Sequence, residues 1–231
     1  MSTITIYRNR LHAGEQLGEV ILPEINKLRS KGNQVQPIVY ALPRGGIPVA
    51  FPVAQQLSCP LDIIVAKKIT LPKNPELAIG AVSSEGKVLW SNSGLYRQKS
   101  SQELKTAQQE AETKAKAQLE LFADYLPQVD PRGAIAIIID DGIATGMTIA
   151  VAAQAAKAKK PAQVWICTPV APKELIPHVK KWGTRAIILE TPDPFFSVSR
   201  FYIEFPQTSS EEAIAYLNQH NQRLSYVPNK N

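Results

Sequence analysis

The apolar run Ala134–Ile139 (AIAIII) restricts the fold of this chain more than any other part of its sequence. A strand with one face in water alternates apolar and polar residues, whereas a parallel strand covered on both faces is apolar throughout. The stretch Thr148–Lys160 follows it, rich in Ala and without Gly or Pro, and predicts a helix that ends before Pro161. A buried strand joined to a helix in this way indicates an α/β sheet.

The same alternation extends over most of the chain. Apolar runs of strand composition alternate with stretches of helical periodicity, which indicates βαβ units and an α/β fold with a twisted parallel sheet flanked by helices. The expected strands are Pro37–Leu42, Leu61–Ala66, Ala134–Ile139, Gln163–Thr168 and Arg185–Leu189, and the expected helices are Ile47–Leu57, Ser100–Phe122, Thr148–Lys160, Lys173–Trp182 and Glu211–Gln219.

Two of the expected helices have further features that the structure can test. Pro52 is awkward within the second expected element, the helix Ile47–Leu57. Ser100 and Glu103 have the spacing of a capping box, which marks the start of the clearest helix.

A segment in the middle of the chain departs from the alternation. Thr70–Ser93 is rich in Pro, Gly, Asn and Ser, so we expect a long excursion there. Within it, Ile79–Ser83 and Lys87–Trp90 predict one hairpin.

The length of 231 residues suits one soluble domain. We expect a single domain over residues 1–231 with a core of about 35–190. The terminal segments, 1–34 and 191–231, would form a small hood, because the C-terminal one breaks the alternation with an aromatic loop, Pro192–Phe205.

Composition limits which classes of ligand and which cellular compartment are expected. The formal net charge of +6 favours anionic ligands, but the charge is spread out, as on an ordinary solvated surface, so nucleic acid is not the expected partner. Cys59 and Cys167 form no CxxC pair. No apolar run approaches the roughly 20 residues of a membrane span, and the N-terminus lacks the apolar core of a signal peptide. A cytoplasmic protein without a membrane partner is expected.

The segment Ile137–Thr148 (IIIDDGIATGMT) carries the strongest functional signal. Ligands of open α/β sheets bind outside the carboxyl ends of strands, and a helix N-terminus offers free N–H groups and partial positive charge to a phosphate. Gly146 allows close approach of the backbone, and the hydroxyls of Thr145 and Thr148 can donate to phosphate oxygens. Asp140 and Asp141 would repel a phosphate, so vicinal sugar hydroxyls are their natural partners.

Two further groups of residues follow strands that should end at the same edge. Pro43-Arg44-Gly45-Gly46 follows the first strand and combines a cation with two glycines. On its own this sequence is more typical of a surface turn. Lys67 and Lys68 are expected to end the second strand, where alternation lets only one of them face a ligand, although a solvated pair would look the same.

The segment Ile137–Thr148 resembles the signature of type I phosphoribosyltransferases. The resemblance implies a donor, 5-phosphoribosyl 1-diphosphate, whose ribose hydroxyls bind Asp140 and Asp141. It assigns the diphosphate to Arg44, Gly45 and Gly46, with Lys68 preferred over Lys67. It assigns the 5-phosphate to Ala144, Thr145, Gly146, Met147 and Thr148.

The resemblance extends over most of the chain. The stretches Arg10–Gly14, ALPRGGIPVA, AKKITLPKNPELAIGAVSSEG and TPDPFFSVSRFYIEF are similar to a group of bacterial phosphoribosyltransferases whose acceptor is unsettled. The reaction implied is transfer of the phosphoribosyl group to a planar nitrogenous base, with release of diphosphate and Mg²⁺. The metal would be held mainly by substrate oxygens, so no metal-binding residues of the protein are expected; His12, His178 and His220 have no ligand spacing.

The resemblance leaves the acceptor side open. The purine-binding acid of hypoxanthine–guanine members is replaced here by Ala144. In adenine-type members a Glu of the mobile loop serves instead, and that loop corresponds to Thr70–Asn92. Glu76 is preferred over Glu85 as the third candidate catalytic residue, beside the two aspartates, although each could be a solvated loop carboxylate.

The base is expected to stack on the C-terminal aromatic segment. Phe195 and Phe196 are the chosen candidates, with Phe201 and Tyr202 also available, and each could instead pack in a core.

Two other function classes are compatible with parts of the pattern. A regulatory protein of the same fold, which senses the donor and binds RNA or DNA, is the alternative, but it would favour a dense basic face or an appended winged-helix domain. A hydrolase of phosphorylated sugars is disfavoured because the sequence has no GxSxG or HExxH motif. A homodimer is left open.

Overall fold

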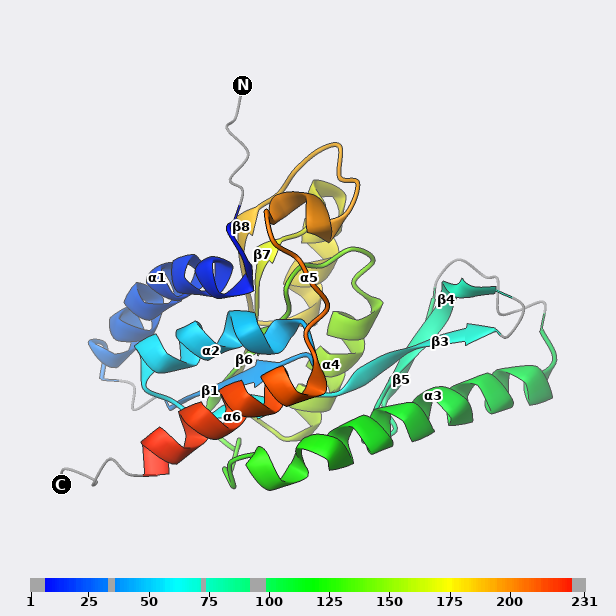
Figure 1. Cartoon of the computed structure of the whole chain (residues 1–231), viewed down its shortest axis with the longest axis horizontal. Helices are drawn as coiled ribbons and strands as arrows, with labels where there is room; N and C mark the ends of the chain where they lie inside the picture. Colours follow the sequence, from blue (N-terminus) through cyan, green and yellow to red (C-terminus); the bar gives the residue numbers. More distant parts are fainter. Residues whose placement is uncertain (1–6, 33–35, 72–73, 92–98, 226–231) are drawn as a thin grey trace.

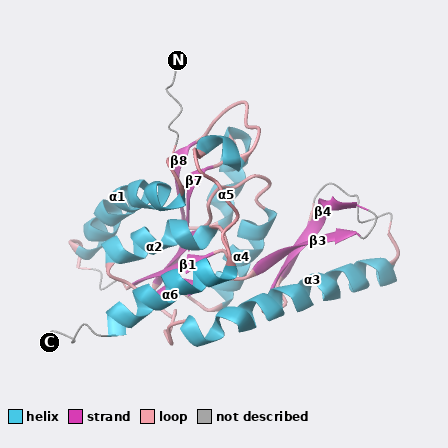
Figure 2. Ribbon diagram, in the orientation of Figure 1, coloured by secondary structure: helices cyan, strands magenta, loops and turns pink. Residues whose placement is uncertain are grey.

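The computed structural model describes residues 7–32, 36–71, 74–91 and 99–225, without the side chains of residues 74–76 and 225. A five-stranded parallel sheet with helices on both faces forms the body of the molecule (Figures 1 and 2). Its strands are β1 (Pro37–Ala41), β2 (Leu61–Ile63), β6 (Ile135–Ile139), β7 (Gln163–Val170) and β8 (Arg185–Glu190), in the order β2-β1-β6-β7-β8. The predicted α/β fold is confirmed.

All the expected helices are present, and one further helix precedes the first strand. They are α1 (Arg10–Arg29), α2 (Gly46–Leu57), α3 (Ser101–Phe122), α4 (Met147–Ala158), α5 (Ile176–Trp182) and α6 (Ser210–Ser225), with short 3₁₀ turns at Ala123–Tyr125, Lys173–Leu175 and Val198–Phe201. Pro52 is accommodated within α2. Ser100 caps α3, and the predicted capping box with Glu103 is present. None of the helices in the described part of the chain is long and apolar enough to cross a membrane.

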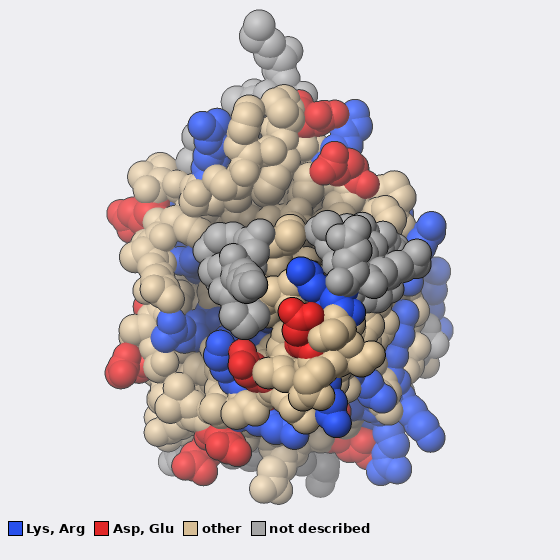
Figure 3. Space-filling view, turned by 90° about the vertical axis from the view of Figure 1, so that its right-hand side faces the viewer, with Lys and Arg blue, Asp and Glu red and all other residues tan. Residues whose placement is uncertain are grey.

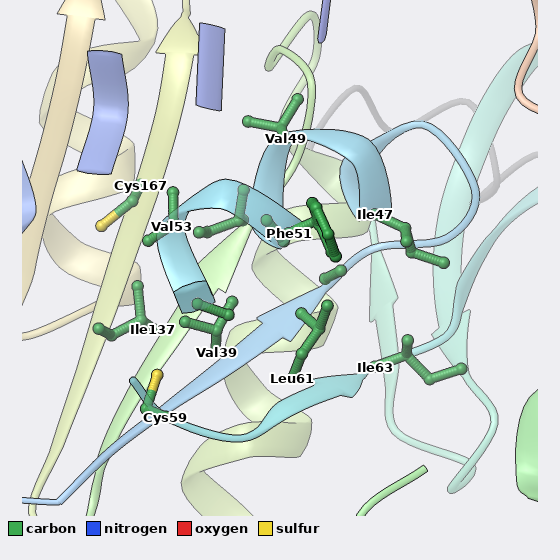
Figure 4. Packing of buried hydrophobic residues seen from close by; sticks show 14 of the residues in the cluster. Val39, Ile47, Val49, Phe51, Val53, Cys59, Leu61, Ile63, Ile137 and Cys167 are labelled. Atoms are coloured by element: carbon green, nitrogen blue, oxygen red, sulfur yellow. The ribbon is translucent and has the colours of Figure 1, made fainter. Parts of the chain in front are cut away.

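The central strands are buried on both faces, as the continuous apolar run predicts. All five residues of β6 are buried. In β1, Val39 packs with α1, α2 and α6 in the cluster drawn in Figure 4, whereas Ile38 and Tyr40 pack on the other face with α4 and α5. The sheet therefore lies between two layers of helices, and the loops that follow its strands lie at the edge of the sheet.

The helix α1 was not predicted, and it changes the expected division into core and hood. Leu17, Ile21 and Ile25 are fully buried in the principal core, so most of residues 1–34 belongs to the core rather than to a hood. Gly14, Gly18 and Pro23 made this stretch a weak helix candidate in sequence. Gly14 is needed because a Cβ there would overlap the backbone oxygen of Val49, where α1 packs on α2.

The segment after β2 differs from the prediction. The expected strand Leu61–Ala66 ends at Ile63, and a new antiparallel sheet begins with β3 (Ala66–Leu71), continues with β4 (Asn74–Ser83) and ends with β5 (Val88–Trp90). The predicted hairpin is therefore confirmed as part of a larger sheet.

This small sheet projects from the body beside α3 (Figure 1). Ile69, Ile79 and Val82 pack against Ala107 and Ala111 of α3. The excursion expected from the sequence is therefore an ordered antiparallel sheet in the described residues. The expectation that Lys67 and Lys68 end the second strand is wrong, because both lie within β3.

Candidate functional site

The end of β6 and the start of α4 form one wall of a cavity. Lys68 of β3 and the partly buried Asp140 line this cavity of about 180 Å³. The rest of its lining consists of Gly142, Ile143, Ala144, Thr145, Gly146, Thr148 and Ile149. The first backbone N–H groups of a twelve-residue helix lie at this wall, so the cavity offers an anion hydrogen-bond donors and partial positive charge.

Gly146 is the N-cap of α4, and two features of its position require glycine. Its φ is +76°, in the left-handed region. An added Cβ would lie 2.5 Å from the Trp182 ring and 3.0 Å from Leu175. The side chain that glycine lacks would therefore meet α5 and the turn before it.

The two aspartates after β6 differ in their surroundings. Oδ1 of Asp140 accepts a hydrogen bond of 2.9 Å from the N–H of Asp141. Burial raises the pKa of Asp140 well above its usual range, and the negative charge of Asp141 raises it further. Ligand groups that donate hydrogen bonds to Asp140, or a cation beside it, would favour its charged form.

Asp141 is held by groups from both ends of the chain. Nε of Arg10 donates to its Oδ2 at 2.8 Å, and the Tyr202 hydroxyl donates to its backbone oxygen at 2.6 Å. Burial raises the pKa of Asp141, while the Arg10 guanidinium lowers it. The hood thus consists of residues near Tyr7–Arg10 and of the aromatic loop, joined by a bridge between Tyr7 and Tyr202.

The loop Pro43–Gly46 meets the signature because β1 and β6 are neighbours in parallel register, with Ala41 beside Ile139. The Pro43–Arg44 peptide is cis. A Cβ on Gly45 would overlap the Asp141 carboxylate, and one on Gly46 would lie 2.7 Å from the Ile139 oxygen. The two glycines therefore permit contact between the two loops, which a plain surface turn would not require.

Besides Arg10, three further cations lie near this loop. Nη1 of Arg44 donates to Ser210 Oγ at 3.1 Å, at the start of α6. Lys68 lines the cavity. Burial lowers the pKa of Lys67, and the positive charges of Arg44 and Lys114 lower it further, so Lys67 lies within electrostatic reach of the same loop. Lys68, the residue preferred from the sequence, is thus the one that contacts the cavity, although it reaches it from β3.

The structure tests only one of the two carboxylates, Glu76 and Glu85, that the sequence offered for contact with the acceptor. Glu76 lies on β4, but its side chain lies outside the described residues. Glu85 pairs with Lys159 at 3.0 Å, beyond the C-terminal end of α4. A helix of twelve residues is about 18 Å long. Glu85 is therefore remote from the cavity and is not a candidate for contact with the acceptor.

The two phenylalanines chosen from the sequence, Phe195 and Phe196, lie in different surroundings. Phe195 stacks on Phe201, with ring centroids 6.1 Å apart, inside the hood cluster. Phe196 is 68% exposed, and the Arg200 guanidinium lies 4.5 Å from its ring centroid. A Cβ on Gly142 would lie 2.5 Å from Val198, so this loop covers the start of the signature. Phe196, rather than Phe195, has a face available for a planar ligand.

Arg10 begins one of the stretches that carry the family resemblance, but the sequence alone indicated no role for it in the site. Its guanidinium lies 3.7 Å from the centroid of Phe205 and donates through Nη1 to the Pro206 oxygen. The sequence does place Arg10 next to Asn9, which caps α1, but an isolated arginine carries no pattern of its own. The described residues contain no cluster of three or more His, Cys, Asp or Glu that could hold a metal by themselves.

Comparison of the chain with known proteins identifies its family. Residues 9–200 match the model of the phosphoribosyl transferase domain. Two Mycobacterium tuberculosis proteins named as phosphoribosyl transferases are each 33% identical over 216 residues, which is 92% of this chain and 46% of theirs. The chain thus spans about half the length of these relatives. The crystal structure of the protein TT1426 from Thermus thermophilus is 27% identical, with a TM-score of 0.74 over 93% of this chain and 99% of that one.

Proposed function

Because the chain belongs to the phosphoribosyl transferase domain family, we propose that it transfers the phosphoribosyl group of 5-phosphoribosyl 1-diphosphate to a nitrogenous acceptor. The observation that carries this proposal is the cavity between Lys68 and the start of α4, with Asp140 at its edge. It combines an anion site with a carboxylate that can accept hydrogen bonds from sugar hydroxyls.

The donor would lie along the loops at the carboxyl edge of the sheet. Its 5-phosphate would bind the N–H groups and hydroxyls of the segment Ala144, Thr145, Gly146, Met147 and Thr148. The ribose hydroxyls would bind Asp140 and Asp141, and the diphosphate would bind Arg44, Gly45, Gly46 and Lys68. Contact between Gly45 and the Asp141 carboxylate supports this pose, because it brings the ribose and diphosphate sites together.

The reaction is a displacement at the anomeric carbon. The C1–O bond breaks and its electron pair leaves on the diphosphate, while a nitrogen lone pair of the acceptor forms the new C1–N bond. The transition state carries oxocarbenium-like positive charge. Arg44 and Lys68 would stabilise the leaving diphosphate, and the aspartates would hold the ribose so that its C1 faces the acceptor.

Mg²⁺ fits this arrangement as a partner of the substrate. Asp140 lines the cavity, and burial and the negative charge of Asp141 raise its pKa, a setting in which a hard divalent cation is favourable. Asp140 would hold it together with oxygens of the donor. Such an ion supplies positive charge that stabilises the leaving diphosphate.

The acceptor side of the proposal rests on fewer contacts. Phe196 would stack on the planar acceptor, since its face is exposed, whereas Phe195 would only support the hood. Glu76 keeps its proposed role in managing a proton of the acceptor. Lys and Arg side chains are numerous on the face in Figure 3, but Asp and Glu lie among them, so that face gives no support to the nucleic-acid-binding alternative.

Calorimetry with the donor tests this function. In Mg²⁺ the donor should bind, and ribose 5-phosphate should bind more weakly because it lacks the diphosphate. Lys68→Met should weaken donor binding by about tenfold or more, the usual effect of losing one charge-assisted hydrogen bond. Lys87→Met is the matched control, because Lys87 is exposed beside β5 and does not line the cavity. Absence of donor binding, or equal loss in both variants, would contradict the proposal.

A further inference from the structure

The small sheet of β3, β4 and β5 has an apolar core of its own. In the described residues, its buried members Ile69, Ile79 and Val82 share no cluster with the buried residues of the five-stranded sheet. The helix α3 joins the two parts, since Ala115 and Phe122 in its second half lie in the principal core. The position of the small sheet against the body therefore depends on α3 and on the contacts at the base of the sheet.

Two polar contacts hold this base, at the turn of residues 84–87 between β4 and β5. The N–H of Ser84 donates to the Val65 oxygen at 3.0 Å. Nζ of Lys159 lies 3.0 Å from Oε1 of Glu85. Glu85 precedes Gly86, whose φ of +79° belongs to a tight turn. The turn thus presents the Glu85 carboxylate to the end of α4.

Lys159 is held from the body as well as from the small sheet. It is the C-cap residue of α4, and its Nζ lies 5.6 Å from the centroid of the Tyr40 ring. Burial raises the pKa of Asp62, and the positive charge of Lys159 lowers it, so these two groups lie within electrostatic reach. Lys159 therefore connects the turn that carries Glu85 to β1 and β2 of the five-stranded sheet.

The small sheet meets α4 at both of its ends. Lys68 of β3 lines the cavity at the start of the helix, and Glu85 binds at its end, about 18 Å away. Lys68 is exposed, so its direction is set by the position of β3 rather than by side chains packed around it. A shift of the small sheet along α4 would move Lys68 relative to the cavity.

We propose that the ion pair between Glu85 and Lys159 is a positioning contact for the donor site. It fixes the base of the small sheet at the far end of α4 and thereby keeps Lys68 at the cavity. The inference rests on the proposed function, because it uses the contact of Lys68 with the donor. It adds two positioning residues that lie outside the site and do not touch the donor.

The opposite charges of the two residues make the inference testable. The donor is an anion, so loss of the negative charge of Glu85 should by itself strengthen donor binding, whereas loss of the positive charge of Lys159 should weaken it. A positioning contact predicts weaker binding in both cases. Glu85→Gln and Lys159→Met should each lower donor affinity by about two- to fivefold, the usual strength of a partly exposed ion pair.

Calorimetry with the donor and Mg²⁺ measures these variants and their combinations. Glu85→Gln together with Lys159→Met should lose no more affinity than the larger single loss, because both changes remove one contact. In a Lys68→Met background, Glu85→Gln should change donor affinity by less than about 1.5-fold, because the residue that it positions is gone. Glu24→Gln is the matched control: Glu24 pairs with Arg185 at 2.6 Å and at similar exposure, but that pair joins α1 to β8.

Hydrogen exchange of the free protein provides a readout that needs no donor. The N–H of Ser84 donates to Val65 at the base of the small sheet. Its exchange should be about two- to fivefold faster in Glu85→Gln than in the wild type, because the turn opens more often without the ion pair. In Glu24→Gln it should be unchanged.

The possible failures are distinct. If the wild type does not bind the donor, the proposed function fails, and the exchange at Ser84 alone decides whether the ion pair fixes the small sheet. If Glu85→Gln binds the donor as tightly as the wild type or more tightly, the inference is overturned. It is also overturned if Glu85→Gln costs as much affinity in the Lys68→Met background, or if the exchange at Ser84 does not change.

Discussion

Gly146→Ala is the change whose cost can be worked out most directly from the structure. Gly146 has a φ of +76°, and non-glycine residues in this region cost roughly 1–2 kcal/mol. An added Cβ would also lie 2.5 Å from the Trp182 ring, and overpacking of this kind costs about 1–3 kcal/mol. We therefore expect the free energy of unfolding to fall by about 2–5 kcal/mol.

Gly133→Ala is a matched control within the same chain. Gly133 has a φ of +74°, but nothing lies within 4 Å of an added Cβ. This variant should show only the conformational cost, about 1–2 kcal/mol. The difference between the two variants measures the packing against Trp182 alone.

Urea unfolding followed by circular dichroism measures both variants, with the midpoint shift interpreted only if the slope is unchanged. A further variant, Gly146→Ala combined with Trp182→Leu, should show a smaller cost of the alanine than in the wild-type background, because the ring atoms that it meets are gone. If Gly146→Ala costs no more than Gly133→Ala, the reasoning about α5 is refuted.

Three other changes test separate parts of the structure. Burial raises the pKa of Asp62 to about 6; the folded state therefore binds more protons than the unfolded state between about pH 4 and 6, and stability falls as pH rises through this window, by up to about 3 kcal/mol. Asp62→Asn should reduce the slope in unfolding measured from pH 4 to 7, with Asp140 and Asp141 left to contribute in the same direction, and an unchanged slope would exclude Asp62 as a source. Ser100→Ala removes the capping box with Glu103 and should lower stability by about 1 kcal/mol in urea unfolding, whereas no loss would mean that the cap contributes nothing. Phe196→Ala should change stability by less than about 0.5 kcal/mol because the ring is exposed, yet raise the acceptor KM; an unaltered KM would remove Phe196 from the acceptor site.

Local sequence was sufficient for the parallel core and for the loop after β6. Continuous apolar runs report burial on both faces directly, and the change from a strand through Asp140 and Asp141 to a helix is contained within a few residues. The small sheet was missed because β3 and β4 are ordered by their packing on α3, which follows later in the chain. Strand propensity alone does not report such contacts.

The amino-acid sequence by itself determined the α/β core, the glycine-capped start of α4 and the pair of aspartates, because each depends on neighbours in the chain. Only the tertiary structure decided that Arg10 reaches Asp141 across 131 positions, that Lys68 enters the cavity from β3, and that Glu85 is withdrawn to Lys159. These contacts join segments far apart in the chain, and their partners are set by which strands and helices pack together. Short-range patterns carry no information on that choice, so the half of the site that would meet the acceptor emerged only from the fold.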